Sequence, residues 1–425
     1  MVLLDIMSEK TIKLYDENAY STEFTAKVVS CEKVEDKEGL FKVVLDRTLF
    51  FPEEGGQTPD KGIIIPFSDE ESASFEEHGT IPESVSAGKG AAIEVQDVQI
   101  KNDVIFHFVT SELKAHSVVF GRIDFGHRFS NMQQHSGEHI FSGIVNSKFG
   151  YDNVGFHLSD SIVTMDYSGQ LSPEEISDIE LSVNQAIYEN REIRAFYPSP
   201  EELSDIDYRS KKELIGAVRI VEVDGYDVCA CCAPHVKRTG EIGILKVVSF
   251  QNYKGGTRVS ILCGKRALEF LSGEHSMIQE LAGELSTSGD NIPTIVHKQQ
   301  EEIASLKRSL SEAGEKLLNI EADKLPEGVK NVCLFADKDS DPNVIRRVVN
   351  RLVSERAGFC GIFFGNEADG FRFIIGSGDG LNSNDIIAEL KKSFNVRGGG
   401  KPAMVQGSIE GASEEAIREV FNMVS

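Results

Sequence analysis

Two segments far apart in the chain carry metal-binding residue types at the same spacing. His135 and His139 stand four residues apart in the run QQHSGEH, and Cys231 and His235 repeat that spacing in the run CACCAPH. On a helix, side chains four residues apart lie on one face, and two imidazoles placed in this way can bind one metal ion. Zinc needs more than two such ligands, so we predict a fold that brings both pairs together in one zinc site.

Each half of this pattern also has an ordinary explanation. Two histidines fall four apart by chance, and a cysteine-rich run can be a buried patch of small apolar side chains. A zinc-protease helix is not indicated, because it has Glu directly after the first histidine, where this chain has Ser136. Because the ligand types of the two halves complement each other, the metal site is the favoured interpretation.

Length and composition indicate an ordinary multi-domain protein. A chain of 425 residues favours two to four domains, and an apolar content of 40% suffices for their cores. The sequence has no run of eighteen apolar residues and no signal-peptide pattern at its start, so we expect a cytoplasmic protein with no membrane partner. Three of the seven cysteines lie within four residues, which fits metal binding better than disulfides.

The net charge of −24 argues against indiscriminate nucleic-acid binding, because phosphate binding depends on Lys and Arg. Local basic groups are still present. Each has an ordinary explanation as a solvated face. The two groups are Lys254, Arg258, Lys265 and Arg266, and Lys391, Lys392, Arg397 and Lys401.

Residues 1–117 form the first predicted domain, and their pattern is typical of β-structure. Strands are expected at 24–29, 41–45 and 104–109, which are rich in β-branched and aromatic residues. The run TLFFPEEGGQ at 48–57 predicts a strand entering a sharp turn, where two glycines let the main chain approach a ligand or simply form a β-turn. The acidic, Ser-rich residues 68–90 indicate a surface insertion or a mobile loop.

Residues 118–265 form a predicted α/β domain that holds the metal-binding pattern. Strands are expected at 162–167 and at 219–223, the latter leading to the cysteines. A helix is expected to begin at the N-cap Ser172 and to end near Asn190.

Residues 266–325 form a predicted helical segment, and residues 326–425 a separate α/β unit. Between 296 and 320 apolar residues recur in steps of three and four, a heptad seam that packs on another helix within the chain or across a dimer. In the last unit, strands are expected at 331–335, 360–364 and 371–375, with a helix near 343–356. The run GGGKP at 398–402 predicts a Gly-rich loop, but not a P-loop, because Pro402 stands where Ser or Thr is required.

Several of these motifs together resemble the long-form AlaX-type alanyl-tRNA editing proteins, which are similar to the editing and C-terminal parts of alanyl-tRNA synthetase. Their order and spacing match over nearly the whole chain. The stretches that carry the resemblance are TLFFPEEGGQ at 48–57, MQQHSGEH at 132–139, GFHL at 155–158, CCAPH at 231–235, TGEIG at 239–243 and GGGKPAMVQG at 398–407.

The resemblance implies a trans-editing hydrolase that deacylates mischarged tRNA-Ala, chiefly seryl-tRNA-Ala, with glycyl-tRNA-Ala as a second substrate. It also implies a multi-domain α+β fold. The expected parts are a β-barrel-like N-terminal domain, a zinc-containing editing domain of the type shared with threonyl-tRNA synthetase, a helical coiled-coil segment and a C-terminal domain of the kind found beside Asp-His-His phosphoesterases. Nothing resembles an ATP-binding aminoacylation core, so the chain is not expected to charge tRNA.

Within this resemblance, the metal-binding residues take specific roles. We expect His135, His139 and Cys231 to bind one zinc ion per chain, with His235 either a fourth ligand or displaced by substrate. Glu138 is a candidate general base, or it points to solvent.

The turn near residue 55 is expected to hold the substrate. The hydroxyl of Thr48 can pair with the hydroxyl of a seryl group, and an alanyl group would leave it unpaired. Gln57 and the backbone of Gly55 and Gly56 are expected to hold the terminal ribose or the carbonyl.

The segment from about 266 to 425 is expected to bind tRNA and to form a homodimer. Backbone N–H groups in the run at 398–400, beside Arg397 and Lys401, suit phosphate. The heptad seam has to bury its apolar side chains, and a partner chain is one surface on which it can do so.

Two other function classes remain as alternatives. A non-catalytic tRNA- or RNA-binding module with structural zinc would have a sealed Cys/His tetrad away from any pocket. A phosphoesterase would need an Asp-His-His cluster, and the sequence contains no such run.

Overall fold

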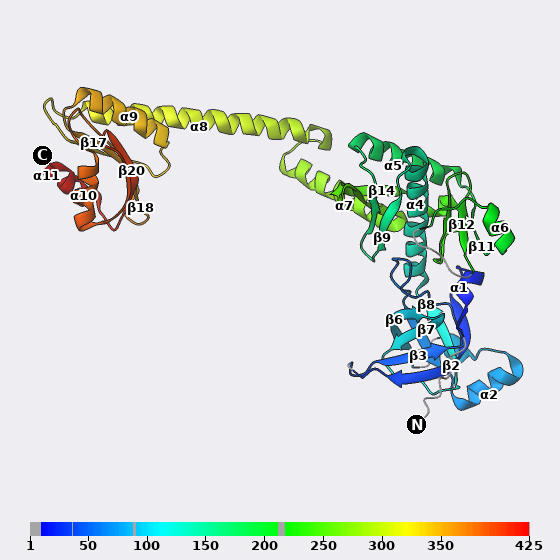
Figure 1. The fold of residues 1–425 in the computed structure, drawn as a ribbon. Helices are drawn as coiled ribbons and strands as arrows, with labels where there is room; N and C mark the ends of the chain where they lie inside the picture. The colour runs from blue at the N-terminus through cyan, green and yellow to red at the C-terminus, as the bar shows by residue number, and fades with distance from the viewer. Residues whose placement is uncertain (1–9, 36, 88–90, 211–216, 425) are drawn as a thin grey trace. The chain divides into compact units, whose positions relative to one another are not determined.

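The computed structural model describes residues 10–35, 37–87, 91–210 and 217–424 (Figure 1). The chain divides into two compact units, Met1–Met277 and Ile278–Ser425. No helix in the described ranges is both long and apolar enough to cross a membrane.

The N-terminal part is a closed six-stranded barrel, as expected. Its strands alternate inward apolar and outward polar side chains, so one face of each strand builds the barrel core. The last strand lies beyond residue 117, so the barrel includes residues assigned to the second domain from the sequence. The order around the barrel is β2 (Glu23–Lys33), β3 (Phe41–Leu45), β7 (Val104–Val109), β6 (Ile93–Lys101), β5 (Gly62–Pro66) and β8 (Val118–Ile123).

Short elements complete this part of the chain. The strand β1 (Ile12–Lys13) pairs in parallel with β4 (Arg47–Thr48), and α1 (Leu14–Glu17) follows β1. Between β5 and β6, the insertion near 68–90 forms α2 (Asp69–His78) and α3 (Glu83–Ser86). The predicted insertion is therefore present in its described residues as two short helices and not as a mobile loop, because Ser68 and Glu71 cap α2 reciprocally and Phe75 packs on Phe67.

The second part of the first unit is built around the 25-residue helix α4 (Phe125–Phe149), which begins at the N-cap Asp124. A buried pair joins its first turns to the barrel: the guanidinium of Arg128 donates to the carboxylate of Asp60 and to the carbonyl of Leu49. In Figure 1, α4 runs from the barrel into the α+β part, so its middle turns lie between the two.

Two antiparallel sheets pack around α4. One has the order β14 (Leu245–Tyr253), β15 (Gly256–Cys263), β10 (Val163–Tyr167) and β9 (Asn153–Leu158), and the other has β11 (Ile193–Phe196), β12 (Ile220–Val223) and β13 (Asp227–Ala230). The predicted helix is α5 (Pro173–Glu189), with Ser172 and Glu175 in a capping box and Asn190 as C-cap. Cys229 lies in β13, and Cys231 and Cys232 follow that strand and not β12, which corrects the expectation for 219–223. The remaining elements are α6 (Pro200–Asp205) and the 3₁₀ turn η1 (Thr239–Ile242).

Two long helices follow the sheets. The first is α7 (Gly264–Glu284), and the 3₁₀ turn η2 (Gly289–Asn291) leads into the 32-residue α8 (Ile292–Asp323). The predicted seam lies on α8, and six of its apolar residues are 39–67% exposed: Val296, Ile303, Leu306, Leu310, Leu317 and Ile320. The last turns of α8 are anchored by Leu318 and Ala322, which are buried in the core of the C-terminal sheet.

The second unit contains a five-stranded sheet, and all three predicted strands belong to it. The order is β16 (Val332–Ala336), β17 (Phe359–Asn366), β18 (Gly370–Ser377), β20 (Met404–Glu410) and β19 (Asn395–Lys401). The helices are α9 (Pro342–Glu355), which was predicted, α10 (Asn384–Ser393) and α11 (Glu414–Met423).

The Gly-rich run at 398–402 is not the loop that we predicted. Gly398, Gly399 and Gly400 lie in β19 and pair with β20. A Cβ on Gly400 would stand 2.4 Å from the carbonyl oxygen of Met404, so only glycine allows this close approach. The run therefore lies in the edge strand of the sheet and not in an open loop.

Candidate metal centre

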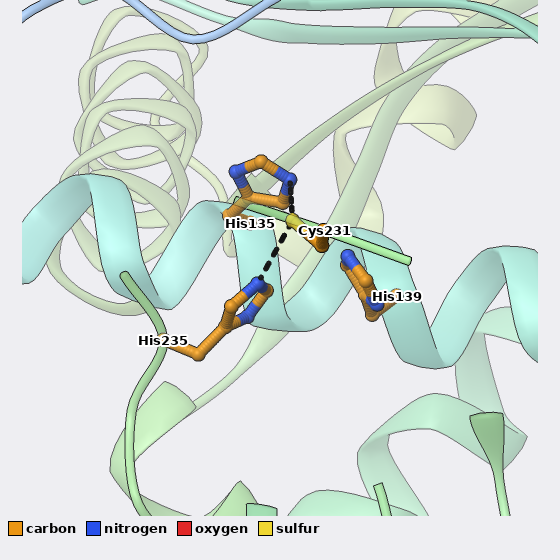
Figure 2. A group of neighbouring side chains, drawn as sticks. All are labelled: His135, His139, Cys231 and His235. Atoms are coloured by element: carbon orange, nitrogen blue, oxygen red, sulfur yellow. Dashed lines mark hydrogen bonds between the residues drawn. The ribbon is translucent and has the colours of Figure 1, made fainter. Parts of the chain in front are cut away.

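Four side chains from two distant segments converge beside α4 (Figure 2). His135 and His139 project from successive turns of α4, while Cys231 and His235 lie on the loop after β13. The Cys231 sulfur lies 3.6 Å from His135 Nε2 and 3.4 Å from His235 Nε2. One ligand atom from each of the four lies within 4.8 Å of all the others. The structure thus confirms that the two spaced pairs meet.

Each histidine of this group uses its other ring nitrogen in a hydrogen bond. The Nδ1 atom of His135 lies 2.8 Å from Gln57 Oε1, that of His139 2.9 Å from Asp227 Oδ2, and that of His235 3.0 Å from Ser136 Oγ. A partner that accepts from Nδ1–H leaves the Nε2 lone pair free, which is how proteins orient histidines toward a metal.

This donor set fits a metal ion. Three imidazoles and one thiol sulfur are ligands that zinc prefers, and four ligands make a tetrahedral set. The three histidines are buried, and the group has three Nδ1 partners that hold its rings in place. The four residues can therefore hold a metal ion.

The electrostatics of the group favour the thiolate form of Cys231 and act in opposite directions on His235 and His139. Burial works to raise the pKa of Cys231, but the neighbouring imidazoles, His135 foremost, outweigh burial and hold this pKa well below its ordinary value. Burial lowers the pKa of His235 to about 3. For His139, burial opposes the charged form, yet the hydrogen bond to Asp227 raises its pKa well above the ordinary value.

Asp227 is itself anchored. Arg209 donates from Nε to Asp227 Oδ1 at 2.7 Å and from a terminal nitrogen to Oδ2 at 2.9 Å. The carboxylate therefore links the half-buried guanidinium of Arg209 to His139, and both of its oxygens are fixed. Asp227 also falls in a second possible ligand group with His139 and Cys229, but its bidentate pairing with Arg209 suits an orienting role.

The turn at 55–57 lies against the metal group. Gly55 and Gly56 have φ of +63° and +85°, a left-handed conformation that favours glycine. A Cβ on Gly56 would meet the carbonyl oxygen of Phe156 at 2.5 Å. The turn is fixed to the end of β9 by Leu158, whose N–H donates to Gly56 O, and it directs Gln57 to His135.

Thr48 lies in the barrel and its hydroxyl is already engaged. It stands 2.9 Å from His107 Nε2, and His107 Nδ1 lies 3.3 Å from the carbonyl of Val43. Only an N–H can pair with a carbonyl, so Nε2 is the acceptor and the Thr48 hydroxyl donates to it. The N–H of Phe50 donates to Thr48 Oγ1 at 3.1 Å, which leaves one lone pair on that oxygen.

Glu138 does not point to solvent. It is 1% exposed, and its Oε1 accepts hydrogen bonds from Ser142 and from Asn153, each at 2.6 Å. The bond from Asn153 ties α4 to β9. The base role predicted for Glu138 stays a prediction, and its buried hydrogen bonds favour a positioning role.

The remaining predicted residue, Lys401, belongs to the second unit. It is the last residue of β19 and is exposed to solvent. The phosphate contact expected for Lys401 therefore concerns the second unit and not the metal group, which lies in the first.

Sequence reasoning missed three residues that support the site. Asp227 and Ser136 hold the imidazoles of His139 and His235, and His107 fixes the hydroxyl of Thr48. Ser136 directly follows a ligand in the sequence, which is a weak signal. Nothing in the sequence pairs Asp227 or His107 with its partner, because those contacts join different strands and helices.

Known protein families match one segment in each of the two units. Residues 218–260 match the family described as the threonyl and alanyl tRNA synthetase second additional domain, and residues 328–425 match the DHHA1 domain. The chain is 26% identical over 422 residues to the alanyl-tRNA editing protein AlaX-L of Pyrococcus horikoshii, a match that covers 95% of this chain and 96% of that protein.

Alanine–tRNA ligases match over a similar stretch of this chain but only part of their own. The ligase of Ignicoccus hospitalis is 28% identical over 427 residues, covering 98% of this chain and 43% of the ligase. The ligase of Methanoregula boonei is 28% identical over 424 residues, which cover 93% of this chain and 41% of that ligase. The chain thus spans less than half the length of these ligases. The chain is similar to the alanyl-tRNA editing protein AlaX-L over nearly the full length of both, and two of its segments match the second additional domain and the DHHA1 domain.

Proposed function

We propose that this chain is a trans-editing hydrolase that deacylates mischarged tRNA-Ala, with seryl-tRNA-Ala as the main substrate and glycyl-tRNA-Ala as a second one. In this proposal one zinc ion per chain is held by His135, His139, Cys231 and His235. The match to AlaX-L over almost the full length of both proteins supports the activity, and the donor set supports the metal.

The observation that carries the proposal is the side chain of Gln57. It is fully buried, and its Oε1 accepts from His135 Nδ1, so the orientation of the amide is fixed. Its Nε2 has no hydrogen-bond partner among the described residues. A buried N–H without a partner costs about 1–3 kcal/mol. An oxygen of the substrate next to His135, either the aminoacyl carbonyl or a ribose hydroxyl, would satisfy it.

In the proposed reaction, water attacks the aminoacyl carbonyl and the ester bond to the ribose breaks, releasing the amino acid and a free 3′ hydroxyl. A bound zinc ion supplies orientation of the substrate or a lowered pKa for a coordinated water. Gln57 Nε2 donates to the substrate oxygen and fixes its position beside His135. Gly55 and Gly56 keep the main chain close enough for the substrate to reach this amide.

Thr48 would supply the discrimination. Its hydroxyl proton is committed to His107, so the hydroxyl of a seryl group has to donate to the remaining lone pair of Thr48 Oγ1. An alanyl group would leave that lone pair unsatisfied, which is how a buried polar group rejects an analogue lacking the hydroxyl.

A second candidate function is a non-catalytic RNA-binding module with structural zinc. The observation that favours it is burial, since the three histidines are only 2–5% exposed. In addition, two cavities of the same unit, of about 850 and 600 Å³, are lined by other residues. Four protein ligands make a closed site unless one of them leaves, and His235 is the ligand we assign to that step.

For the second unit, we propose tRNA binding and homodimer formation. The exposed apolar seam of α8 supports a helical partner, because six large or β-branched apolar side chains in heptad register are left in solvent. Lys401 at the end of β19 is a candidate phosphate contact as a point charge, without the backbone cradle expected from the sequence.

The test is deacylation of seryl-, glycyl- and alanyl-tRNA-Ala with and without a chelator. Gln57→Glu sharpens it, because the variant keeps an acceptor for His135 and removes the free donor. We expect this variant to retain metal and lose seryl-tRNA hydrolysis, while the exposed control Gln185→Glu behaves as wild type. A chain that binds zinc but hydrolyses none of the three substrates supports the RNA-binding module instead.

A further inference from the structure

The helix face that carries the metal ligands continues toward the N-terminus of α4 with two more polar side chains. His127, Asn131 and His135 are spaced at four-residue steps, so they lie along one face. With a rise of 1.5 Å per residue, His127 lies about 12 Å along the helix from His135. This polar stripe begins at the barrel end of α4 and leads to the metal group.

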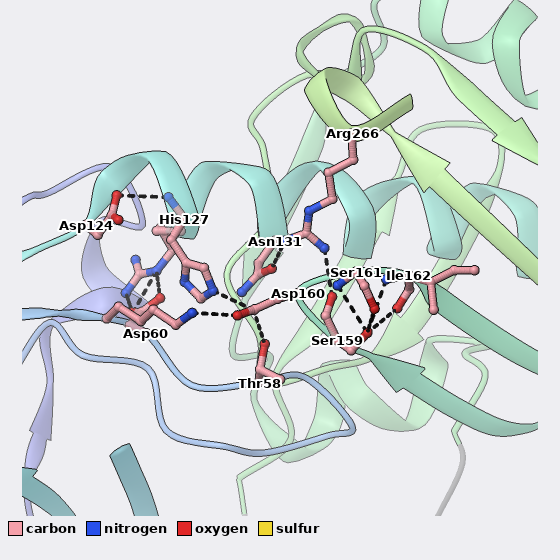
Figure 3. A network of polar contacts seen from close by, with 12 residues as sticks. Thr58, Asp60, Asp124, His127, Asn131, Ser159, Asp160, Ser161, Ile162 and Arg266 are labelled. Atoms are coloured by element: carbon pink, nitrogen blue, oxygen red, sulfur yellow. Dashed lines mark hydrogen bonds and ion pairs between the residues drawn. The ribbon is translucent and has the colours of Figure 1, made fainter. Parts of the chain in front are cut away.

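Arg266 approaches this stripe from the start of α7 (Figure 3). It donates to the carbonyl of Ser159 at 2.8 Å and to Asn131 Oδ1 at 2.7 Å. A guanidinium has five N–H donors, and these two bonds leave three of them. Arg266 is half-buried and forms no close ion pair with any residue in the described ranges; Asp160 acts on it only at longer range.

The nearest carboxylate is already occupied. Asp160 lies 2.5 Å from Lys61 Nζ and 2.8 Å from His127 Nε2. It also accepts from Thr58, as Figure 3 shows. Asp160 also acts electrostatically on Arg266, so this one carboxylate faces the two cations Lys61 and Arg266, and one positive charge is left over. Asp160 and Lys61 are exposed, so the cluster is open to a ligand from solvent.

Two buried polar atoms in this cluster lack hydrogen-bond partners among the described residues. They are Asn131 Nδ2, on a side chain with 0% exposure, and His127 Nδ1. An unpaired amide donor at a fully buried position costs free energy unless a ligand satisfies it. The leftover cation and the unpaired donor therefore point to the same kind of ligand, an anion with oxygen acceptors.

We propose that Arg266 and Asn131 bind a backbone phosphodiester of the acceptor strand, next to the terminal nucleoside whose ester is hydrolysed at the metal group. The inference rests on the proposed function, because it names the part of the tRNA that the stripe holds. Arg266 supplies charge-assisted hydrogen bonds to the phosphate oxygens, and Asn131 supplies one neutral donor. This would confine phosphate binding in a strongly acidic chain to a built site.

The test compares two seryl esters that differ by one phosphodiester: 3′-seryl-adenosine, which has none, and the 3′-seryl ester of the dinucleotide CpA. In the full-length wild-type chain, we expect the CpA ester to have a KM at least about tenfold lower. Arg266→Gln should abolish this advantage and leave hydrolysis of seryl-adenosine unchanged. Its neighbour Lys265, whose side chain is 80% exposed, provides the matched control Lys265→Gln, which should keep the advantage.

A second variant guards against a folding defect in Arg266→Gln. Asn131→Asp keeps the shape and pairs Arg266 internally, so it should show the same selective loss for the CpA ester. The dependence of log KM on log salt should also fall by about 0.7 for one lost phosphate contact. Equal losses on both esters in these variants, or no loss on either, would overturn the inference.

Failure of the proposed function gives a different result. If the wild-type chain hydrolyses neither ester, binding of unesterified CpA and of adenosine, measured by calorimetry, still tests the site. Wild-type preference for CpA that disappears in Arg266→Gln supports the phosphate site even then. No preference for CpA in the wild-type chain contradicts it.

Discussion

Replacing Asp227 by Asn should weaken metal binding without removing a metal ligand. The carboxylate accepts from His139 Nδ1 at 2.9 Å and is 1% exposed as a side chain. Asn has the same shape and one carbonyl oxygen, so it can satisfy either His139 or Arg209, but not both. Its NH₂ group has to face a second N–H donor, which leaves one buried group unpaired.

Two magnitudes follow from this geometry. Loss of a carboxylate that orients a histidine ligand typically costs 10–100-fold in metal affinity, or about 1.4–2.7 kcal/mol. In the Asp227→Asn variant without metal, the substitution also removes the ion pair with Arg209, whose two hydrogen bonds measure 2.7 and 2.9 Å. Breaking a buried pair costs ~3–5 kcal/mol in the free energy of unfolding, and the remaining Asn carbonyl puts the expected loss at the lower end.

The assay separates these two effects. Zinc affinity is measured by competition with a chromophoric chelator on folded protein, and the free energy of unfolding by urea titration in excess chelator. Asp224→Asn is the matched control, because it removes the charge of an aspartate whose ion pair, with Arg191 at 3.3 Å, is exposed to solvent. Wild-type zinc affinity in folded Asp227→Asn, or an equal decrease in Asp224→Asn, would refute the assigned role of the carboxylate.

Three further outcomes are expected. Thr48→Val leaves His107 Nε2 without its donor, so the free energy of unfolding should fall by about 1–3 kcal/mol. The ratio of seryl- to alanyl-tRNA hydrolysis should fall about tenfold, and an unchanged ratio in single-turnover assays contradicts the role of Thr48. Burial lowers the pKa of His107 to about 4, so between pH 6.5 and 4 the unfolded chain binds a proton on this residue that the folded chain does not. As the pH falls through this range, the free energy of unfolding of the wild-type chain should decrease by about 3 kcal/mol relative to that of His107→Gln, and parallel pH profiles in urea unfolding would contradict this. Leu310→Glu on the seam of α8 should raise the dimer dissociation constant, measured by sedimentation, at least about tenfold, whereas Lys307→Glu should not. Equal effects of the two variants would show that the seam is not the interface.

The ligand set could be predicted because its signal is local. Four-residue spacing places His135 and His139 on one face of any helix, and Cys231 and His235 repeat that spacing and supply donor types that complement them in one group. The N-cap box at Ser172 fixed the start of α5 for the same reason, since its donors and acceptors are neighbours in the sequence.

The partners of those ligands could not be predicted, because each contact joins elements that only tertiary structure brings together. Gln57 reaches His135 from a barrel turn, and Asp227 reaches His139 from a strand of another sheet. The prediction that Gln57 holds the terminal ribose or the carbonyl therefore did not include its contact with the imidazole of His135.

Glycine and charge misled the prediction in two places. The run at 398–400 has the composition of a loop, but here the missing Cβ atoms let β19 approach β20. Residues 68–90 have few large apolar side chains, yet Phe75 on α2 packs against Phe67 and is enough to hold a short capped helix.

The most direct test of the central claim is zinc reconstitution followed by hydrolysis. The chain is stripped with chelator and titrated with zinc, and single-turnover deacylation of seryl-tRNA-Ala is measured at each point, with the double variant His135→Ala/Cys231→Ala in parallel. The account predicts that the rate rises in proportion to bound zinc, saturates at about one equivalent per chain, and stays at background in the double variant. A rate independent of zinc, or a double variant that binds one equivalent and hydrolyses the ester as the wild-type chain does, would contradict it.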